Sequence, residues 1–283
     1  MTAALTVDHE MRELTVTGAQ GCALLVRDFG PREAPAIVLV HGLGADGLVW
    51  RHQIDALAGE HRVIVVDLRG HGRSEAPDDA SYSSSSTWAA DLAAVLAQTG
   101  VFRPVVIGWS YGGLVVADYV AAHGTDSIAG IALVAPLRKV GTDEAFGLLA
   151  EVFLGVVPGL LADTLPESVA AARTFVDLIP GVPWTDAERY ERLGAALTVS
   201  PAVRAAMFAR ECDTDSVWVD VKVPMLLAYG TADQIVKQES TMSLAELLPD
   251  ATVSVYDSAG HSPFTDAADR FNRDVRDLVA RTR

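Results

Sequence analysis

A serine flanked by glycines is the feature of this chain best suited to covalent chemistry. The stretch Gly-Trp-Ser-Tyr-Gly-Gly at 108–113 follows an apolar run at 104–107 that predicts a buried strand, and it precedes an apolar segment at 114–120 that predicts a helix. A G-x-S-x-G turn between a strand and a helix holds its serine in strained backbone with the hydroxyl projecting outward. We therefore expect Ser110 to be a nucleophile. Gly108 and Gly112 are expected where neighbouring backbone passes close to the turn.

Other kinds of site chemistry have no comparable pattern in this sequence. It contains no group of histidine, cysteine and carboxylate residues with metal-ligand spacing, no G-x-G-x-x-G turn and no phosphate-binding Walker loop. We therefore expect neither a metal nor a cofactor.

The elements that would position Ser110 alternate along the chain in a regular way. Continuous apolar runs are typical of parallel strands covered on both faces, and they occur at 36–40, 63–66, 105–107, 128–134, 225–229 and 252–256. Segments with helical patterns separate them, at 48–58, 86–98, 114–123, 238–248 and 267–281. A pair of edge strands is expected at 14–16 and 22–28, and the serine run at 81–86 is expected to be a loop and helix N-cap. The pattern predicts an α/β fold with a mostly parallel, doubly wound sheet.

One long interval, residues 137–215, interrupts this alternation. It is helix-like and contains no buried-strand run. Breaks are expected at Pro158, Pro166, Pro180-Gly181, Pro183 and Pro201. Roughly eighty residues is too long for a plain loop in a compact domain. We therefore expect a core domain formed by residues 1–136 and 216–283, with residues 137–215 inserted as a helical cap, or lid. This segment is called the insertion below.

The chain resembles the α/β-hydrolase family in several motifs at the ends of its predicted strands. They are the G-W-S-Y-G turn at 108–112, H-G-L-G at 41–44, D-L-R-G-H-G-R-S at 67–74, G-T-A-D at 230–233 and the loop around His261. The resemblance extends from about residue 24 to the C-terminus and is weakest in the insertion. It is greatest to serine esterases grouped with bacterial cofactor-free haloperoxidases and perhydrolases, and it implies the α/β-hydrolase fold.

This resemblance implies a catalytic triad of Ser110, Asp233 and His261, in the family's chain order. His261 would be the base that activates Ser110, and Asp233 would hold the imidazole tautomer and stabilise the imidazolium. Three other acids could take the role of Asp233, namely Asp213, Asp215 and Asp220. They precede the strand and would therefore lie at the end opposite the serine turn. His41 and His71 are interpreted as loop-bracing residues.

The resemblance also implies an oxyanion hole made of two backbone N–H groups. The amide of Tyr111 lies at the start of the helix after the serine, where the helix dipole favours negative charge. The second amide would be that of Leu43, which Gly42 and Gly44 leave free to turn inward.

The substrate pocket is expected between the serine turn and the insertion, with apolar and aromatic walls. Its expected substrate-binding residues are Trp109, Leu137, Phe146, Phe153, Trp184 and Ile235, and further candidates are Leu43, Tyr111, Phe175 and Phe208. Because basic residues are not concentrated in the insertion, a neutral hydrophobic ester or lactone is favoured over a phosphorylated substrate. The same fold leaves several alternatives open. They are perhydrolysis, cofactor-free haloperoxidase activity, C–C bond hydrolysis, thioester hydrolysis and a non-enzymatic role as a ligand receptor.

Composition and charge limit the kinds of partner that we expect this protein to bind. The chain has 283 residues, half of them hydrophobic, and a formal net charge of −15, which argues against nucleic acid and anionic membranes. No signal peptide or transmembrane segment is visible, so we expect a cytoplasmic protein. Its expected partner is a small-molecule substrate, and it is expected to be a monomer or a homodimer. Cys22 and Cys212 are expected to be free thiols, although a disulfide between them stays open.

Overall fold

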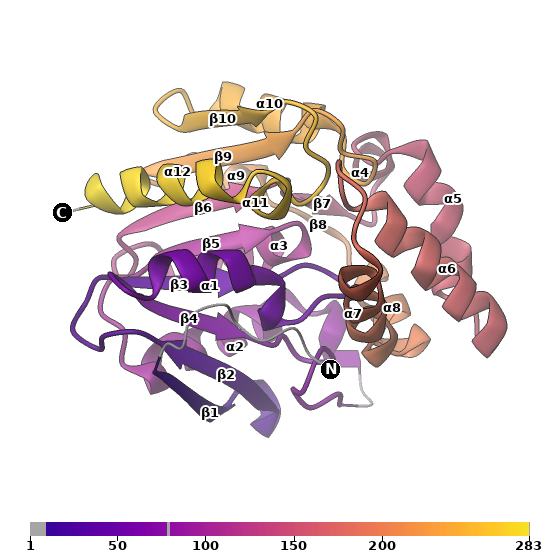
Figure 1. The fold of residues 1–283 in the computed structure, drawn as a ribbon, viewed down its shortest axis with the longest axis horizontal. Helices are drawn as coiled ribbons and strands as arrows, with labels where there is room; N and C mark the ends of the chain where they lie inside the picture. Colours follow the sequence, from indigo (N-terminus) through magenta and orange to yellow (C-terminus); the bar gives the residue numbers. More distant parts are fainter. Residues whose placement is uncertain (1–9, 78–79, 283) are drawn as a thin grey trace.

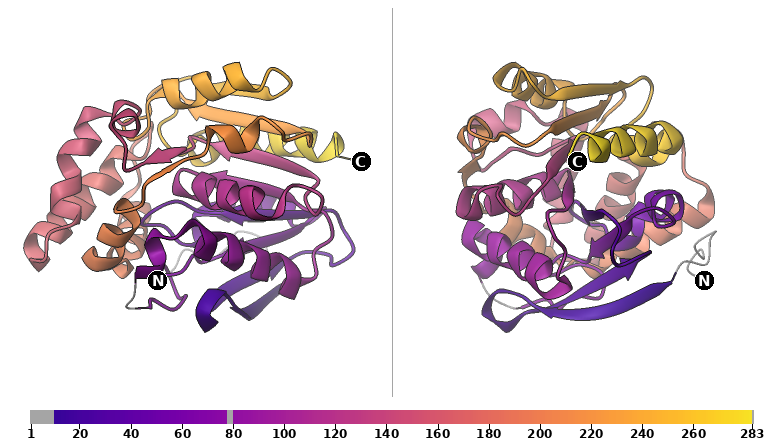
Figure 2. Two further views of the ribbon diagram at one scale, coloured as in Figure 1. Left: turned by 180° about the vertical axis from the view of Figure 1, so that it is seen from behind. Right: turned by 90° about the vertical axis from the view of Figure 1, so that its left-hand side faces the viewer.

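The computed structural model describes residues 10–77 and 80–282, which form an eight-stranded sheet with helices on both faces (Figures 1 and 2). The strand order is β1-β2-β4-β3-β5-β6-β9-β10. The strands from β4 to β10 in this order run parallel, whereas β1 and β2 are antiparallel to their neighbours. The predicted α/β fold with a mostly parallel, doubly wound sheet is confirmed.

The strands lie close to their predicted positions. Their bounds are β1 (Met11–Thr17), β2 (Ala23–Phe29), β3 (Ala36–Val40), β4 (Arg62–Val66), β5 (Val105–Trp109), β6 (Gly130–Val134), β9 (Met225–Gly230) and β10 (Thr252–Tyr256). Every residue of the central strands β3, β4, β5, β6 and β9 is buried. Alternate side chains enter two separate cores, as Ile37 and Leu39 do on one face and Val38 and Val40 on the other. Burial on both faces explains the continuous apolar runs.

The core helices form the two covering layers. They are α1 (Arg51–Leu57), α2 (Ser85–Thr99), α3 (Tyr111–His123), α10 (Gln238–Leu247), α11 (Pro263–Asp266) and α12 (Ala268–Ala280). Helices α1 and α12 pack on one face of the sheet, and α2 and α3 pack on the other (Figure 2, right). The serine run is only partly as predicted. Ser81–Ser83 belong to a 3-10 helix (Ala80–Ser83), and Ser84 at the N-cap position makes no side-chain cap hydrogen bond.

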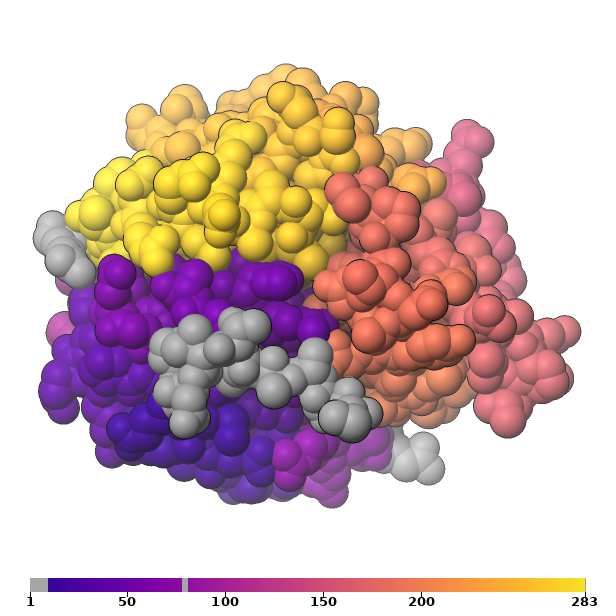
Figure 3. Space-filling view, viewed as in Figure 1, coloured from indigo at the N-terminus to yellow at the C-terminus, as the bar shows by residue number. Residues whose placement is uncertain are grey.

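Helices dominate the insertion, which lies beyond the carboxyl ends of the parallel strands (Figure 1, right side). In chain order the elements are β7 (Lys139–Val140), α4 (Asp143–Gly147), α5 (Glu151–Leu160), α6 (Leu165–Leu178), α7 (Asp186–Thr198), α8 (Pro201–Phe208) and β8 (Cys212–Asp213). Helix α9 (Asp215–Trp218) follows, and its Trp218 is buried in the core. Pro166 and Pro201 start helices, but the break expected at Pro158 is wrong: this proline lies inside the last turn of α5, where only one backbone hydrogen bond is lost. The space-filling view shows the insertion packed directly against the core (Figure 3).

The insertion begins and ends at one short antiparallel pair, β7 and β8, which the sequence analysis did not predict. The buried Lys139 ammonium lies between three carboxylates there, at 2.8 Å from Glu144, 2.9 Å from Asp213 and 2.9 Å from Asp215. These ion pairs fasten the two connecting strands to each other. Cys22 and Cys212 are both free thiols, as expected.

Candidate active site

The turn between β5 and α3 has the strained geometry expected of a nucleophile elbow. Ser110 has φ of 54° and ψ of −118°, a conformation that is costly for a residue with a side chain. A Cβ on Gly108 would lie 2.6 Å from the carbonyl oxygen of Gly112, and one on Gly112 would lie 2.4 Å from that of Val40. The predicted steric requirement for both glycines is therefore confirmed.

Asp233 and His261, which follow β9 and β10, meet at the same edge of the sheet. The Asp233 Oδ2 atom lies 2.7 Å from His261 Nδ1, and both side chains are 2% exposed. The other carboxylate oxygen accepts the backbone N–H groups of Ile235 and Val236 at 2.8 and 3.0 Å, which fixes the carboxylate. A carboxylate at Nδ1 makes this nitrogen the proton donor, so that Nε2 is left as the acceptor that a general base needs.

The His261 loop is attached directly to the serine turn. The indole N–H of Trp109 donates to the carbonyl oxygen of His261 at 2.7 Å, and the two rings lie 5.4 Å apart. Within residues 10–77 and 80–282, no hydrogen bond joins Ser110 Oγ to the His261 imidazole. Contacts of this kind often tighten only when substrate is bound.

The two amides expected in the oxyanion hole are placed beside the serine. Gly42 lies so close that a Cβ there would come within 2.9 Å of the Ser110 Cβ. Leu43 and Tyr111 line the same cavity as Ser110, and in the part of the chain that the structure describes their backbone N–H groups donate to no acceptor. Tyr111 is also the first residue of α3, whose N-terminus favours negative charge.

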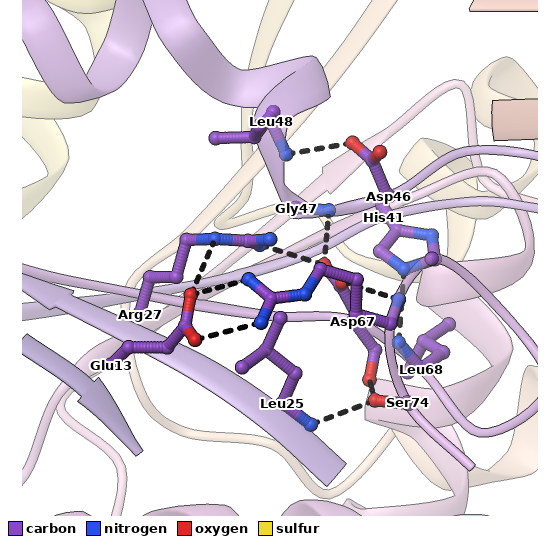
Figure 4. Close-up of polar contacts among 12 residues, drawn as sticks. Glu13, Leu25, Arg27, His41, Asp46, Gly47, Leu48, Asp67, Leu68 and Ser74 are labelled. Atoms are coloured by element: carbon purple, nitrogen blue, oxygen red, sulfur yellow. Dashed lines mark hydrogen bonds and ion pairs between the residues drawn. The ribbon is translucent and has the colours of Figure 1, made fainter. Parts of the chain in front are cut away.

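A buried polar network holds the loop that carries Leu43 (Figure 4). The His41 Nδ1–H donates to the Gly42 carbonyl at 2.8 Å, and its Nε2 accepts the Leu68 N–H at 3.0 Å. Asp67 accepts the Gly47 N–H at 2.8 Å and an Arg27 N–H at 3.0 Å. These bonds support the interpretation of His41 as a residue that braces the loop. Arg27 was not anticipated, because its partner is 40 residues away in the chain.

His71 lies beside His41, with ring centroids 5.2 Å apart and ring planes tilted by 58°. Burial, together with the neighbouring His41, lowers the pKa of His71 to about 3. The unfolded chain protonates this histidine below pH 6.5, so the stability that neutral His71 contributes is complete above that pH and is lost as pH falls toward 3. We expect His71→Asn, which does not titrate, to lose roughly 2 to 3 kcal/mol less unfolding free energy than the parent between pH 7 and 4.5. Urea unfolding at both pH values measures this difference. His123→Asn, at an exposed histidine, is the control. Equal losses in the His71 variant and the parent would contradict the prediction.

The cavity at Ser110 is small and almost entirely apolar. Its volume is about 30 Å³, and its lining consists of Leu43, Ser110, Tyr111, Leu137, Leu149, Phe153, Phe175, Met207, Phe208, Ile235 and Val236. By the same measure one water molecule needs about 10–15 Å³, so the cavity has room for a short chain of heavy atoms. Both the core and the insertion contribute walls.

Three residues expected to bind substrate are not among those that line this cavity. Trp109 packs behind the elbow, with its ring 5.1 Å from Phe264. Phe146 is 54% exposed on the outside of the insertion. The Trp184 ring lies beneath Arg192, and its indole N–H donates to the Val176 carbonyl. An aromatic residue in the sequence suggests a buried side chain, but it does not indicate which surface of the protein that side chain faces. Leu137, Phe153 and Ile235 do line the cavity, whereas Leu149, Met207 and Val236 were missed.

Arg210 is a further residue that the sequence analysis missed. Its fully buried guanidinium contacts both Asp118 oxygens at 2.8 Å and donates to the Tyr111 hydroxyl at 3.0 Å. It follows α8, which supplies two cavity residues, and it ties this helix to the first residue of α3. No sequence signal pairs an arginine with an aspartate 92 residues away.

Two kinds of feature are absent from the described residues. They contain no group of three or more histidine, cysteine or acidic side chains placed to hold a metal ion. None of their helices combines the length and the apolar character needed to cross a membrane.

Comparison with known proteins agrees with this geometry. A model of the alpha/beta hydrolase family matches residues 37–274. The chain is 31% identical over 288 residues to a non-heme chloroperoxidase of Streptomyces lividans, an alignment that covers 94% of this chain and 99% of the relative. It is 30% identical to a bifunctional esterase/perhydrolase of Acinetobacter calcoaceticus, over 92% of this chain and 97% of the relative. The crystal structure of an esterase from Rhodococcus sp. ECU1013 superposes with a TM-score of 0.89 at 34% identity, covering 95% of this chain and 98% of that one.

Proposed function

Because the chain belongs to the α/β-hydrolase family and is a hydrolase, we propose that it cleaves a small-to-medium hydrophobic carboxylic ester or lactone through an acyl-enzyme on Ser110. The observation that carries this proposal is the 2.7 Å contact between Asp233 and His261, at the edge of the sheet where Ser110 opens into an apolar cavity. A buried carboxylate, an oriented imidazole and a strained serine are the parts that acyl transfer requires.

The proposed reaction has two steps. Ser110 Oγ attacks the ester carbonyl carbon while His261 Nε2 takes its proton, and the Leu43 and Tyr111 amides donate to the oxyanion. The tetrahedral intermediate collapses, and the alcohol leaves with the proton from His261. Water then attacks the acyl carbon, His261 accepts its proton, and collapse of the second intermediate returns the proton to Ser110 and releases the carboxylic acid. Asp233 stays ionised and stabilises the imidazolium in both steps.

The lining of the cavity supports a neutral, apolar acyl group. Apart from Ser110 and Tyr111 its walls are hydrophobic, and no positive charge is among them. A volume of about 30 Å³ favours a short acyl chain, so acetate and butyrate esters are the first substrates to test.

The test combines turnover with covalent labelling. We expect hydrolysis of p-nitrophenyl acetate and butyrate, and stoichiometric loss of activity with a serine-directed phosphonate. Peptide mass spectrometry should then find the phosphonate on Ser110. Labelling of another serine, or turnover that survives complete labelling of Ser110, would contradict the proposal.

We further propose that the insertion acts as a lid that selects acyl groups by size, since it supplies Leu149, Phe153 and Phe175 to the cavity. Phe153→Ala is expected to raise kcat/KM for p-nitrophenyl hexanoate relative to acetate by about tenfold, because it opens the wall facing Ser110. A series of esters from acetate to octanoate measures the ranking.

Phe146→Ala is the matched control, since it removes the same side chain from the exposed side of the insertion. Phe153→Leu provides a milder change if the alanine variant is unstable. An unchanged ranking in both Phe153 variants would mean that this residue only supports the fold.

A further inference from the structure

The insertion packs backbone against backbone on the loop that carries His261. Residues 179–181 follow helix α6, and they contact the loop at two glycines. A Cβ on Gly181 would lie 2.2 Å from the Ser258 carbonyl oxygen, and one on Gly260 would lie 2.4 Å from the carbonyl oxygen of residue 179. Such spacing leaves room for glycine only, so the two segments can shift only together.

Hydrogen bonds hold both backbone groups of His261. Its N–H donates to the Ile179 carbonyl at 2.7 Å. Ile179 is the C-cap residue of α6, so this bond also satisfies one of the carbonyl groups that the end of a helix leaves without a partner. The His261 carbonyl accepts the Trp109 indole N–H, also at 2.7 Å. The insertion therefore holds one side of this peptide and the serine turn holds the other.

Asp266 joins the insertion to the same loop a second time. Its Oδ2 atom accepts the Gly260 N–H at 2.8 Å and the Gly181 N–H at 2.9 Å. One carboxylate oxygen thus bridges the insertion and the residue that precedes His261, and hydrogen bonds to an ionised acceptor are roughly twice as strong as neutral ones. The start of the loop is held differently, because the carbonyl groups of residues 256 and 259 accept N–H groups from the turn at 231–232.

Helix α6 connects this contact with the cavity. Its Phe175 side chain lines the cavity beside Ser110. Ile179 lies four residues later, about one helical turn away. A helix of the proposed lid therefore ends at the backbone of the proposed base.

We propose that residues 179–181, together with Asp266, position His261 for catalysis. This inference rests on the proposed function, in which His261 transfers the proton in both steps. The main-chain bonds hold the imidazole where Nδ1 donates to Asp233 and Nε2 can accept the Ser110 proton. These positioning residues act through the base and not on the substrate. Displacing the base by about 1 Å is expected to lower the rate by about 10²-fold.

The first test compares two replacements of Asp266. Asp266→Ala removes the bridge, and we expect it to lower kcat for p-nitrophenyl acetate by about 10²-fold. KM should change by less than about threefold, because the base takes part in both acylation and deacylation. Asp266→Asn keeps an oxygen that can accept the two N–H groups, and its kcat should stay within about tenfold of the parent.

A second variant displaces the insertion without changing a polar group. Gly181→Ala places a methyl group against the Ser258 carbonyl and is expected to lower kcat by at least about tenfold. Gly155→Ala is the matched control, because it makes the same change in α5, where an added Cβ would point into open space among the described residues. It should leave kcat within about twofold of the parent. An unchanged kcat in Gly181→Ala would overturn the role of the insertion, whatever the effect of Asp266→Ala.

The tautomer of His261 supplies a readout that does not depend on turnover. In protein labelled with nitrogen-15 at histidine, two-bond proton–nitrogen spectra report the tautomer of each neutral ring, and the His261 signal is the one that His261→Gln lacks. We expect only the tautomer with the proton on Nδ1 in the parent, Asp266→Asn and Gly155→Ala. Both tautomers should appear in Asp266→Ala and Gly181→Ala, because a displaced ring loses its contact with Asp233.

These spectra separate a failed inference from a failed proposed function. Mixed tautomers in Asp266→Ala and Gly181→Ala support the positioning role even if the parent turns over no ester. The single tautomer of the parent, retained in both folded variants, would overturn it even if kcat fell, because the loss would then not act through the imidazole. If Asp266→Ala does not fold, Gly181→Ala supplies both measurements.

Discussion

Replacing Ser110 by alanine is expected to lower kcat for p-nitrophenyl acetate by roughly 10⁴- to 10⁶-fold. The substitution removes the only atom proposed to form the covalent bond, and His261 then has no hydroxyl to activate. The oxyanion amides and the apolar cavity remain, so a residual rate above the uncatalysed reaction should persist. Initial rates with extensively purified variant, together with the absence of phosphonate labelling, measure the effect.

The control for this variant is Ser262→Ala, in the loop beside His261. Ser262 is fully buried, and its hydroxyl has no hydrogen-bond partner within residues 10–77 and 80–282. Its removal should therefore change kcat by less than about threefold. Turnover by the Ser110 variant within tenfold of the parent would require another nucleophile.

Replacing Asp233 by asparagine is expected to lower kcat by roughly 10³- to 10⁴-fold. The asparagine oxygen can still accept the Ile235 and Val236 N–H groups, so the turn should keep its shape. The amide nitrogen would then face His261 Nδ1 and act as a donor to it. This favours the tautomer with the proton on Nε2, which cannot accept the serine proton.

Asp266→Asn tests whether any change of charge near the loop has the same effect. Asp266 Oδ2 accepts the Gly260 and Gly181 N–H groups at 2.8 and 2.9 Å, and an asparagine oxygen can replace it there. We expect a loss of less than about tenfold in that variant. Comparable losses in the two variants would indicate that Asp233 acts through loop structure and not through the imidazole.

Features set by local backbone geometry were predictable from the sequence. Gly108 and Gly112 must be glycines, because a Cβ at either position would lie within 2.6 Å of a backbone carbonyl oxygen. The five-residue G-x-S-x-G pattern in the sequence reveals this requirement. The strands were equally predictable, because burial on both faces leaves a continuous apolar run in the chain. Helix α3 begins at Tyr111, three residues before its predicted start, because the apolar pattern does not show that the helix begins directly after Ser110.

Whether an apolar or charged side chain of the insertion faces the cavity, another packed surface or solvent was decided only by the tertiary structure. Phe146 and Phe153 lie seven residues apart, yet one is half exposed and the other lines the cavity, because their helices pack on different surfaces. The same holds for charge. Arg210 forms an ion pair with Asp118, 92 residues earlier in the chain, whereas Arg192 forms no ion pair with any described residue. Ion pairing depends on which distant segments of the chain are brought together by packing. No local pattern in the sequence indicates which segments these are.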